Sequence, residues 1–175
     1  MLLHGVGNHR QAWDPALRIL AAERDVIAVD LPGFGSSPSL PDGLSCGVRT
    51  VVPVLASFFE AVGLVRPHVA GNSLGGLLAL ELGQERSVRS ASAFSPAGFW
   101  TRERAQVRLR GTPRDARSGA RNAVALALDH PSIAQRCRHP GGRAVPAFTD
   151  DLPGIPVTAA WGARDLLLPV GRASG

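Results

Sequence analysis

The chain has 175 residues, of which 45% are hydrophobic and 19% charged, and it contains 20 glycines and 14 prolines. This composition excludes a disordered or fibrous protein and fits one globular domain with many turns. No run of about 18 apolar residues occurs, and the first residues lack the basic and apolar regions of a secretory signal. We therefore expect a cytoplasmic protein without a membrane span.

The charge of the chain is unevenly distributed. The net charge is +5, and every basic residue is an arginine. Twelve arginines lie between residues 86 and 143, against three carboxylates. Such a stretch can attract nucleic acid, an anionic membrane or an acidic ligand. No aromatic interleaving or nucleic-acid motif accompanies it, so we interpret it as a solvated helical surface and expect no nucleic-acid or membrane partner.

Strand-like and helix-like patterns alternate from the N-terminus onward. The strand candidates are short apolar runs of the kind buried in parallel sheets, and Asp14 and Pro15 offer an N-cap and a first residue for one helix. This alternation predicts an α/β fold with a mostly parallel sheet flanked by helices. The predicted strands are residues 1–3, 25–30, 67–70, 88–94 and 156–161, and the predicted helices are residues 16–23, 48–62 and 74–85.

Residues 97–152 differ in character from the rest of the chain. They are rich in arginine and hold two amphipathic patches followed by proline and glycine punctuation. This pattern predicts a short helical insert. The chain then divides into a core of residues 1–96, the insert, and a last core strand within residues 153–175.

The strongest motif is Gly71-Asn72-Ser73-Leu74-Gly75, which matches G-x-S-x-G between a predicted strand and a predicted helix. In that context the motif forms a tight turn that exposes the serine with strained dihedrals, and the glycines allow the backbones to approach. The pentapeptide alone also fits a glycine-rich helix start with a capping serine. Its companions decide between the two interpretations.

Three further segments accompany the pentapeptide. They are Leu2-Leu3-His4-Gly5, Asp30-Leu31-Pro32-Gly33-Phe34-Gly35-Ser36-Ser37, and the strand from Ile155 that ends in Trp161-Gly162-Ala163-Arg164-Asp165. In this order the four segments resemble the α/β-hydrolase superfamily, in the branch with a helical cap. The resemblance covers nearly the whole chain and implies a partial α/β-hydrolase fold in which residues 97–152 are the cap.

The resemblance also implies site residues. Ser73 would be the nucleophile, Asp165 the acid that orients a histidine, and the amides of Val6 and Leu74 the oxyanion hole. Gly5, Gly71 and Gly75 would be the glycines of the loop and the elbow. The implied activity is hydrolysis of an ester, amide or related bond of a small molecule by a serine nucleophile, with no cofactor.

Neither a metal nor a nucleotide is expected. Cys46 and Cys137 are too isolated for a disulfide framework or a zinc site with paired-ligand spacing. The glycines near residues 5–7 and 33–35 complete neither a dinucleotide nor a P-loop fingerprint. Nothing in the sequence identifies the substrate or the oligomeric state.

The histidine of the triad has no counterpart in this sequence. The family places it after the acid, but no histidine follows Asp165, and the five histidines all lie between residues 4 and 139. The family's first two strands also precede the strand at residues 1–3, which we expect to lie centrally in the sheet. We therefore expect an incomplete hydrolase domain that lacks both ends, and we do not expect full activity because the triad histidine is absent. The alternative is a non-catalytic module that retains the ligand pocket.

Overall fold

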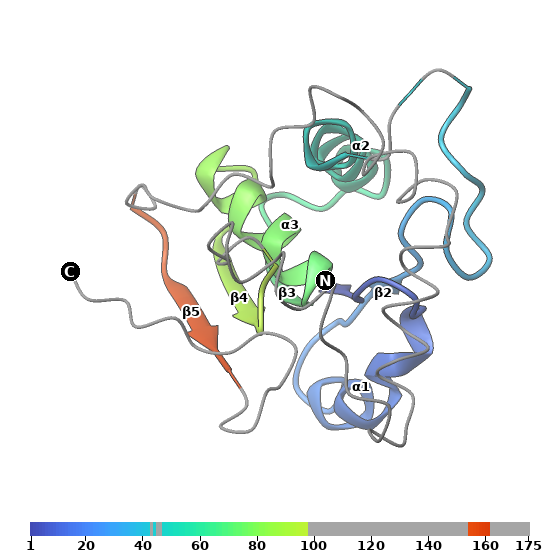
Figure 1. Ribbon diagram of the computed structural model, residues 1–175. Helices are drawn as coiled ribbons and strands as arrows, with labels where there is room; N and C mark the ends of the chain where they lie inside the picture. The colour runs from blue at the N-terminus through green and yellow to red at the C-terminus, as the bar shows by residue number, and fades with distance from the viewer. Residues whose placement is uncertain (43, 45–46, 98–153, 162–175) are drawn as a thin grey trace, which may run out of the picture.

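The computed structural model describes residues 1–42, 44, 47–97 and 154–161. In this part of the chain, five strands form one sheet in the order β2-β1-β3-β4-β5, and every neighbouring pair is parallel. Figure 1 shows the sheet with its helices. The α/β prediction and the parallel sheet are confirmed. The strands are β1 (Leu2–Leu3), β2 (Ala28–Val29), β3 (His68–Asn72), β4 (Ser90–Phe94) and β5 (Val157–Ala160).

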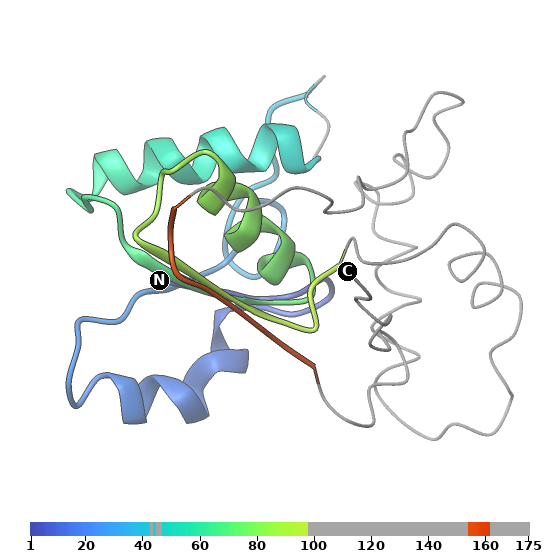
Figure 2. The same ribbon diagram turned by 90° about the vertical axis from the view of Figure 1, so that its left-hand side faces the viewer.

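Helices lie on both faces of the sheet. Helices α2 (Val48–Ala61) and α3 (Leu74–Gln84) cover one face, whereas α1 (Asp14–Leu20) lies on the other (Figure 2). A short 3₁₀ helix, η1 (Arg10–Trp13), leads directly into α1. The described helices include none that is long and apolar enough to cross a membrane. The cytoplasmic location stays a prediction.

The core lies between the sheet and helices α2 and α3. In α2, the buried residues Val51, Leu55 and Phe59 recur every four residues and form one apolar stripe. Helix α3 is buried on nearly all sides, as expected for a helix packed between a sheet and a second helix. The core cluster also includes Leu3, Leu31, Phe34, Val52, Val69, Leu78, Ala79, Leu80, Leu82, Val88, Ala91 and Ala93.

Strand β1 is central despite its length, as expected. It pairs with β2 on one side and with β3 on the other. The amide of Leu2 donates to the Ile27 carbonyl at 2.8 Å, and the amide of Ala70 donates to the Met1 carbonyl at 2.9 Å. The N-terminal amine donates to the His68 carbonyl at 2.9 Å. Backbone groups of both neighbouring strands are therefore paired at this point.

Two local predictions differ from the structure. Asp14 is the first residue of α1 rather than its N-cap, and Trp13 takes the cap position without a side-chain hydrogen bond. The reason is that η1 runs into α1 without an extended residue between them. The strand expected at 25–30 narrows to Ala28–Val29, since its only described partner is the two-residue β1.

The predicted insert lies almost wholly outside the described residues, and so does most of 153–175. The structure nevertheless places the strands on either side of the insert next to each other. Phe94 of β4 pairs with Ala160 of β5, and the amide of Ser95 donates to the Ala160 carbonyl at 2.7 Å. Residues 1–97 and 154–161 therefore share one sheet. The cap itself stays a prediction.

Candidate active site

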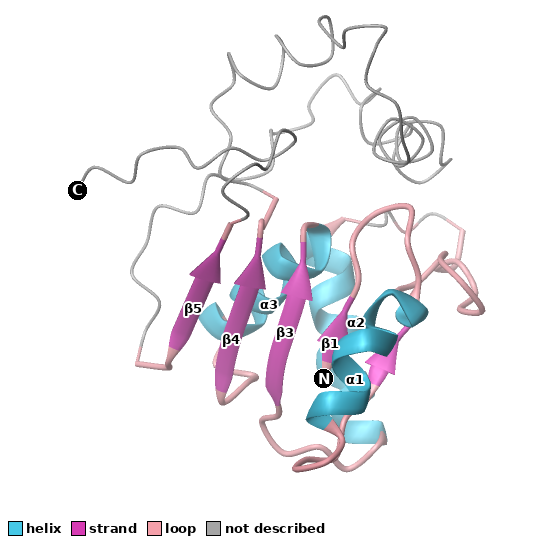
Figure 3. Cartoon of the chain, turned by 90° about the horizontal axis from the view of Figure 1, so that it is seen from below, coloured by secondary structure: helices cyan, strands magenta, loops and turns pink. Residues whose placement is uncertain are grey.

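The carboxyl ends of the parallel strands meet at one edge of the sheet, the edge to which the strand arrows point in Figure 3. Ser73 lies at this edge, between the last residue of β3 and the first residue of α3. Its backbone has φ 53° and ψ −111°, a conformation that residues other than glycine rarely adopt. The strand-to-helix turn and the strain expected of it are therefore present.

Close backbone packing explains the two glycines of the motif. A Cβ added to Gly71 would lie 2.0 Å from the Gly75 carbonyl oxygen. A Cβ added to Gly75 would lie 2.2 Å from the Leu3 carbonyl oxygen. Both contacts involve backbone atoms that cannot rotate away. The spacing G-x-S-x-G therefore lets the turn fold back on itself and lets α3 begin directly against β1.

Ser73 does not cap the helix, so the capping interpretation is wrong. The residue takes the N-cap position of α3, but its side chain makes no capping hydrogen bond. Its backbone is fixed instead. The Ser73 amide donates to the Phe94 carbonyl at 2.9 Å, and its carbonyl accepts from the amides of Leu77 at 3.1 Å and Ala97 at 3.0 Å. These backbone bonds hold the strained turn, and the hydroxyl is not used to cap the helix.

The loop after β1 lies directly against this turn. A Cβ added to Gly5 would lie 3.1 Å from the Ser73 Cβ and 3.3 Å from the Asn72 carbonyl oxygen. Val6 follows Gly5. Leu74 is the first residue of α3, where amides have no acceptor within the helix and the helix dipole favours negative charge. Of the two residues expected to supply oxyanion-hole amides, Leu74 therefore follows Ser73 in the chain, and Val6 follows Gly5, which packs against Ser73.

His4 anchors the start of this loop. Its side chain is buried, its Nδ1 lies 2.7 Å from the Gly5 carbonyl oxygen, and its Nε2 accepts the Leu31 amide at 3.0 Å. Since Nε2 accepts, Nδ1 must carry the proton and donate to Gly5. Burial lowers the pKa of His4, outweighing the opposing effects of the Gly5 hydrogen bond and of Asp30. His4 is thus a neutral bridge between two loops.

Asp30 anchors the end of the loop. Its side chain is 2% exposed and accepts the Arg10 amide at 2.7 Å, the Ser36 amide at 2.9 Å and the Arg10 Nη1 at 2.8 Å. Burial opposes ionisation, but the two amides and the guanidinium outweigh it and hold the pKa of Asp30 below its usual value. A Cβ at Gly35 would lie 2.3 Å from this carboxylate, so only glycine lets the segment after β2 wrap around the Asp30 side chain.

The sequence did not reveal the partner of Asp30. A buried carboxylate is almost always paired, so a cation near Asp30 was a reasonable expectation once the residue was placed at a strand end. The pairing joins residues twenty positions apart, however, and nothing in the spacing of Arg10 pointed to it.

None of the three histidines that the structure describes makes a hydrogen bond to Ser73. Both ring nitrogens of His4 are engaged, and the His9 Nδ1 pairs with the Gln11 side chain. His68 begins β3, about 16 Å along the strand from Ser73, and its Nδ1 lies 2.6 Å from the Ser90 hydroxyl. His130 and His139 lie outside the described residues.

Asp165 also lies outside the described residues, so its predicted role as the triad acid is untested. The strand that precedes it is described. β5 lies two strands from β3 and runs parallel to it, so Ala160, at the end of β5, lies at the same edge of the sheet as Ser73.

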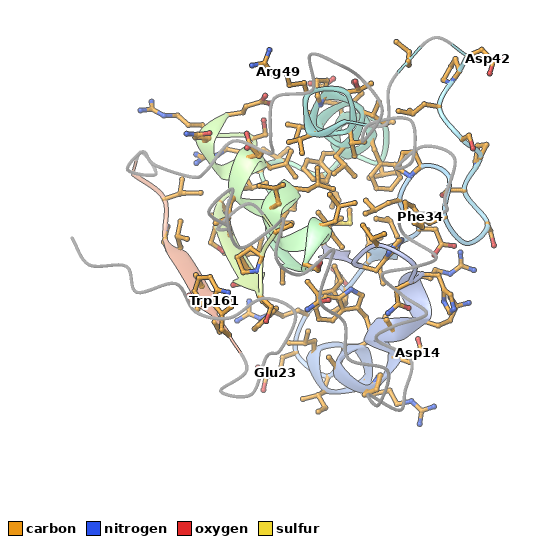
Figure 4. The ribbon with its side chains drawn as sticks, viewed as in Figure 1. Asp14, Glu23, Phe34, Asp42, Arg49 and Trp161 are labelled. Carbon is orange, nitrogen blue, oxygen red and sulfur yellow. The ribbon has the colours of Figure 1, made fainter. Side chains whose placement is uncertain are left out.

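A small apolar cavity lies beside the start of α3. Its volume is about 10 Å³, room for one water molecule at most. Phe34, which is 8% exposed, points into the interior near this cavity, whereas Asp42 and Arg49 lie at the periphery (Figure 4). The lining residues are Leu31, Pro32, Phe34, Gly47, Val48, Val51, Leu74 and Leu78.

Comparisons with known proteins agree with this architecture. A pimeloyl-[acyl-carrier protein] methyl ester esterase of Aeromonas hydrophila is 37% identical over 97 residues, which cover 55% of this chain and 36% of the esterase. A 2-hydroxy-6-oxo-2,4-heptadienoate hydrolase of Pseudomonas putida is 39% identical over 83 residues, covering 46% of this chain and 30% of that enzyme. This chain thus matches about a third of the length of these relatives.

A bacterial membrane phospholipase A of known structure aligns with a TM-score of 0.72 and 27% identity, covering 97% of this chain and 64% of that one. A thermophilic esterase from Thermogutta terrifontis aligns with a TM-score of 0.68 and 22% identity, covering 96% of this chain and 72% of that one, and shows the same fold. The model of the Alpha/beta hydrolase family matches residues 1–174. The chain belongs to the alpha/beta hydrolase family.

Proposed function

We propose that this chain carries the nucleophile and the oxyanion-binding groups of a serine hydrolase that acts on an ester, amide or related bond of a small molecule. One observation carries the proposal. Ser73 is held at φ 53° at the edge of the sheet, without capping α3 and in contact with the loop that contains Val6. Strain of this kind persists only where the surroundings enforce it, and it clusters at functional sites.

The proposed reaction uses Ser73 as a covalent nucleophile. Its Oγ attacks the substrate carbonyl carbon while a base takes the hydroxyl proton, which then passes to the leaving group as the bond to that group breaks. Water hydrolyses the resulting acyl-serine ester and releases the acid. The amides of Val6 and Leu74 stabilise the negative charge on the carbonyl oxygen in both steps.

The base and its orienting acid complete the proposal. A base would take the Ser73 proton, and Asp165 would orient that base. The chain order Ser, Asp, His that this fold uses puts the histidine after Asp165, where this sequence has none, whereas His130 and His139 precede it. The Arg-rich segment 97–152 would cover the site as a cap.

The nature of the bond is inferred from relatives. The similar proteins include a methyl ester esterase, so carboxylic ester cleavage is the reaction we test first. Sites built on the same kind of elbow also cleave other bonds. We therefore propose only that the substrate is a small carbonyl compound.

A second function remains because none of the described histidines serves Ser73. In this alternative the fold binds a small carbonyl ligand without turning it over. Thermal stabilisation by an ester or its acid, without hydrolysis and without covalent labelling of Ser73, would favour this alternative.

The test is covalent labelling with a fluorophosphonate probe, read as intact mass. We expect one adduct on the wild-type chain and none on Ser73→Ala, with Ser90→Ala as the matched control that labels like the wild type. Equal labelling of the wild type and Ser73→Ala would contradict the proposal. Turnover of short-chain nitrophenyl esters is then measured for the wild type, Ser73→Ala and Ser90→Ala. This measurement distinguishes a protein that hydrolyses esters from one that is only labelled.

A further inference from the structure

The loop from Gly5 to His9 is suspended between two side-chain anchors. It leaves β1 at His4 and enters η1 at Arg10. The His4 ring joins the Gly5 carbonyl to the Leu31 amide, and Arg10 binds the carboxylate of Asp30. Both anchors therefore end on two consecutive residues of the strand-end loop after β2.

Between the anchors the loop has little backbone pairing of its own. Among the described residues, the one backbone hydrogen bond within the loop joins the Asn8 amide to the Gly5 carbonyl at 3.3 Å, which is long for such a bond. Gly7 has φ 73°, so the chain reverses direction there. The side chain of Val6 packs against the hydrophobic core, and beyond this contact the position of its amide depends on how firmly residues 4 and 10 are held.

Arg10 makes the second anchor in two ways at once. Its amide reaches Asp30 Oδ1 at 2.7 Å, and its guanidinium Nη1 reaches Oδ2 at 2.8 Å. The carboxylate is 2% exposed, whereas the Arg10 side chain is 46% exposed. Half-exposed ion pairs contribute little to stability, so we expect the same of this guanidinium. Its bond to Asp30 nevertheless fixes the direction in which the Gly5–His9 loop enters Arg10.

We propose that Arg10 is a positioning residue for the oxyanion loop, which acts on the reaction by fixing the Val6 amide through Asp30. This inference rests on the proposed function, since it assigns Arg10 to the site of Ser73. Arg10 would not touch the substrate. Loss of its guanidinium would shift the Val6 amide, a donor that stabilises the negative charge developing on the carbonyl oxygen. The rate of the chemical step would therefore fall.

The test compares Arg10→Met and Arg10→Lys with Arg18→Met, a matched loss of an exposed arginine on α1. The measured quantities are the maximal rate of fluorophosphonate labelling and the probe concentration that gives half of it. For Arg10→Met we expect the rate to fall about tenfold at an unchanged half-saturating concentration, since small displacements of catalytic groups have effects of this order or more. Arg10→Lys should recover part of the rate, and Arg18→Met should match the wild type.

A second measurement makes the inference independent of labelling. Amide hydrogen exchange of residues 5–9 should speed up several-fold in Arg10→Met and stay unchanged in Arg18→Met. Unchanged exchange, or an unchanged labelling rate in an Arg10→Met protein whose wild type labels at Ser73, overturns the inference and leaves the proposed function standing. A wild type that does not label at Ser73 overturns the proposed function and with it the catalytic role of Arg10.

Discussion

The two halves of the candidate site are held by different forces. The elbow around Ser73 is held by backbone contacts, with glycines packed against carbonyl groups and hydrogen bonds to Phe94, Leu77 and Ala97. The facing loop is held by side chains, through the His4 ring and the Asp30 carboxylate. The elbow is thus sensitive to added volume, whereas the facing loop depends in addition on the protonation of His4 and Asp30 and is therefore sensitive to pH.

The largest effect is expected from a methyl group in the elbow. Gly75→Ala gains about 1 kcal/mol of helix propensity, but its Cβ would lie 2.2 Å from the Leu3 carbonyl oxygen. Because the backbone of Leu3 or of the elbow must move to relieve this contact, we expect a net loss of about 3 kcal/mol or more in the free energy of unfolding. Urea denaturation measures it.

Gly63→Ala is the control for that substitution. Gly63 has φ +71°, and nothing lies within 4 Å of an added Cβ, so only conformational strain of about 1 kcal/mol is expected. A Gly75→Ala protein as stable as Gly63→Ala would contradict the account of the elbow.

The next effect concerns the hub of the facing loop. Asp30→Asn keeps the shape of the side chain but replaces one accepting oxygen with a donor that faces the amides of Arg10 or Ser36. We expect a loss of about 2 to 4 kcal/mol in the free energy of unfolding at neutral pH. Asp42→Asn, on the exposed loop, should change stability by less than about 0.5 kcal/mol, and equal losses in the two variants would refute the role of Asp30.

Acid should weaken the same loop in two stages. The folded chain keeps His4 neutral below its ordinary pKa of 6.5 while the unfolded chain binds a proton, so stability falls as the pH drops below that value. Asp30 acts in the same direction at lower pH. It stays ionised in the folded chain below its ordinary pKa of 3.8, and its contribution is lost as the pH falls through the depressed value.

The first stage is measured as the free energy of unfolding at several pH values between 7.5 and 4.5. Its slope can reach about 1.4 kcal/mol for each pH unit from a single group. In His4→Gln, which does not titrate, the slope between pH 6.5 and 5 should decrease. A slope identical to that of the wild type would mean that His4 binds a proton as readily in the folded chain as in the unfolded chain.

The smallest effect concerns the strain at Ser73. Glycine adopts φ 53° without penalty, whereas alanine keeps the strain, so Ser73→Gly should be more stable than Ser73→Ala by about 1 kcal/mol. In a chain of this size that difference corresponds to about 2 to 4 °C in Tm. Equal Tm values for the two variants would indicate that the turn is not strained.

The sequence predicted the elbow better than the loop, and the reason is physical. Steric requirements leave a signature in residue type and spacing, so Gly71, Ser73 and Gly75 could be placed in a strand-to-helix turn from the motif together with its companion segments. The order of strands could also be anticipated from the family resemblance.

The anchors could not be predicted in the same way. The bond between Arg10 and Asp30 depends on where two loops meet in space, and arginine at position 10 carries no spacing signal. The pairing of His68 with Ser90 depends likewise on the register of β3 and β4. The length of the strand predicted at 25–30 was overestimated, because an apolar run indicates burial but not how many of its residues pair with a neighbouring strand.

The most direct test of the account is to map the fluorophosphonate adduct by peptide mass spectrometry. The described part of the chain holds a second serine beside a histidine, Ser90, whose hydroxyl lies 2.6 Å from His68 Nδ1 near the opposite edge of the sheet. The account predicts that the adduct lies on Ser73. An adduct on Ser90, or one on Ser73 that forms no faster than on exposed serines, would contradict it.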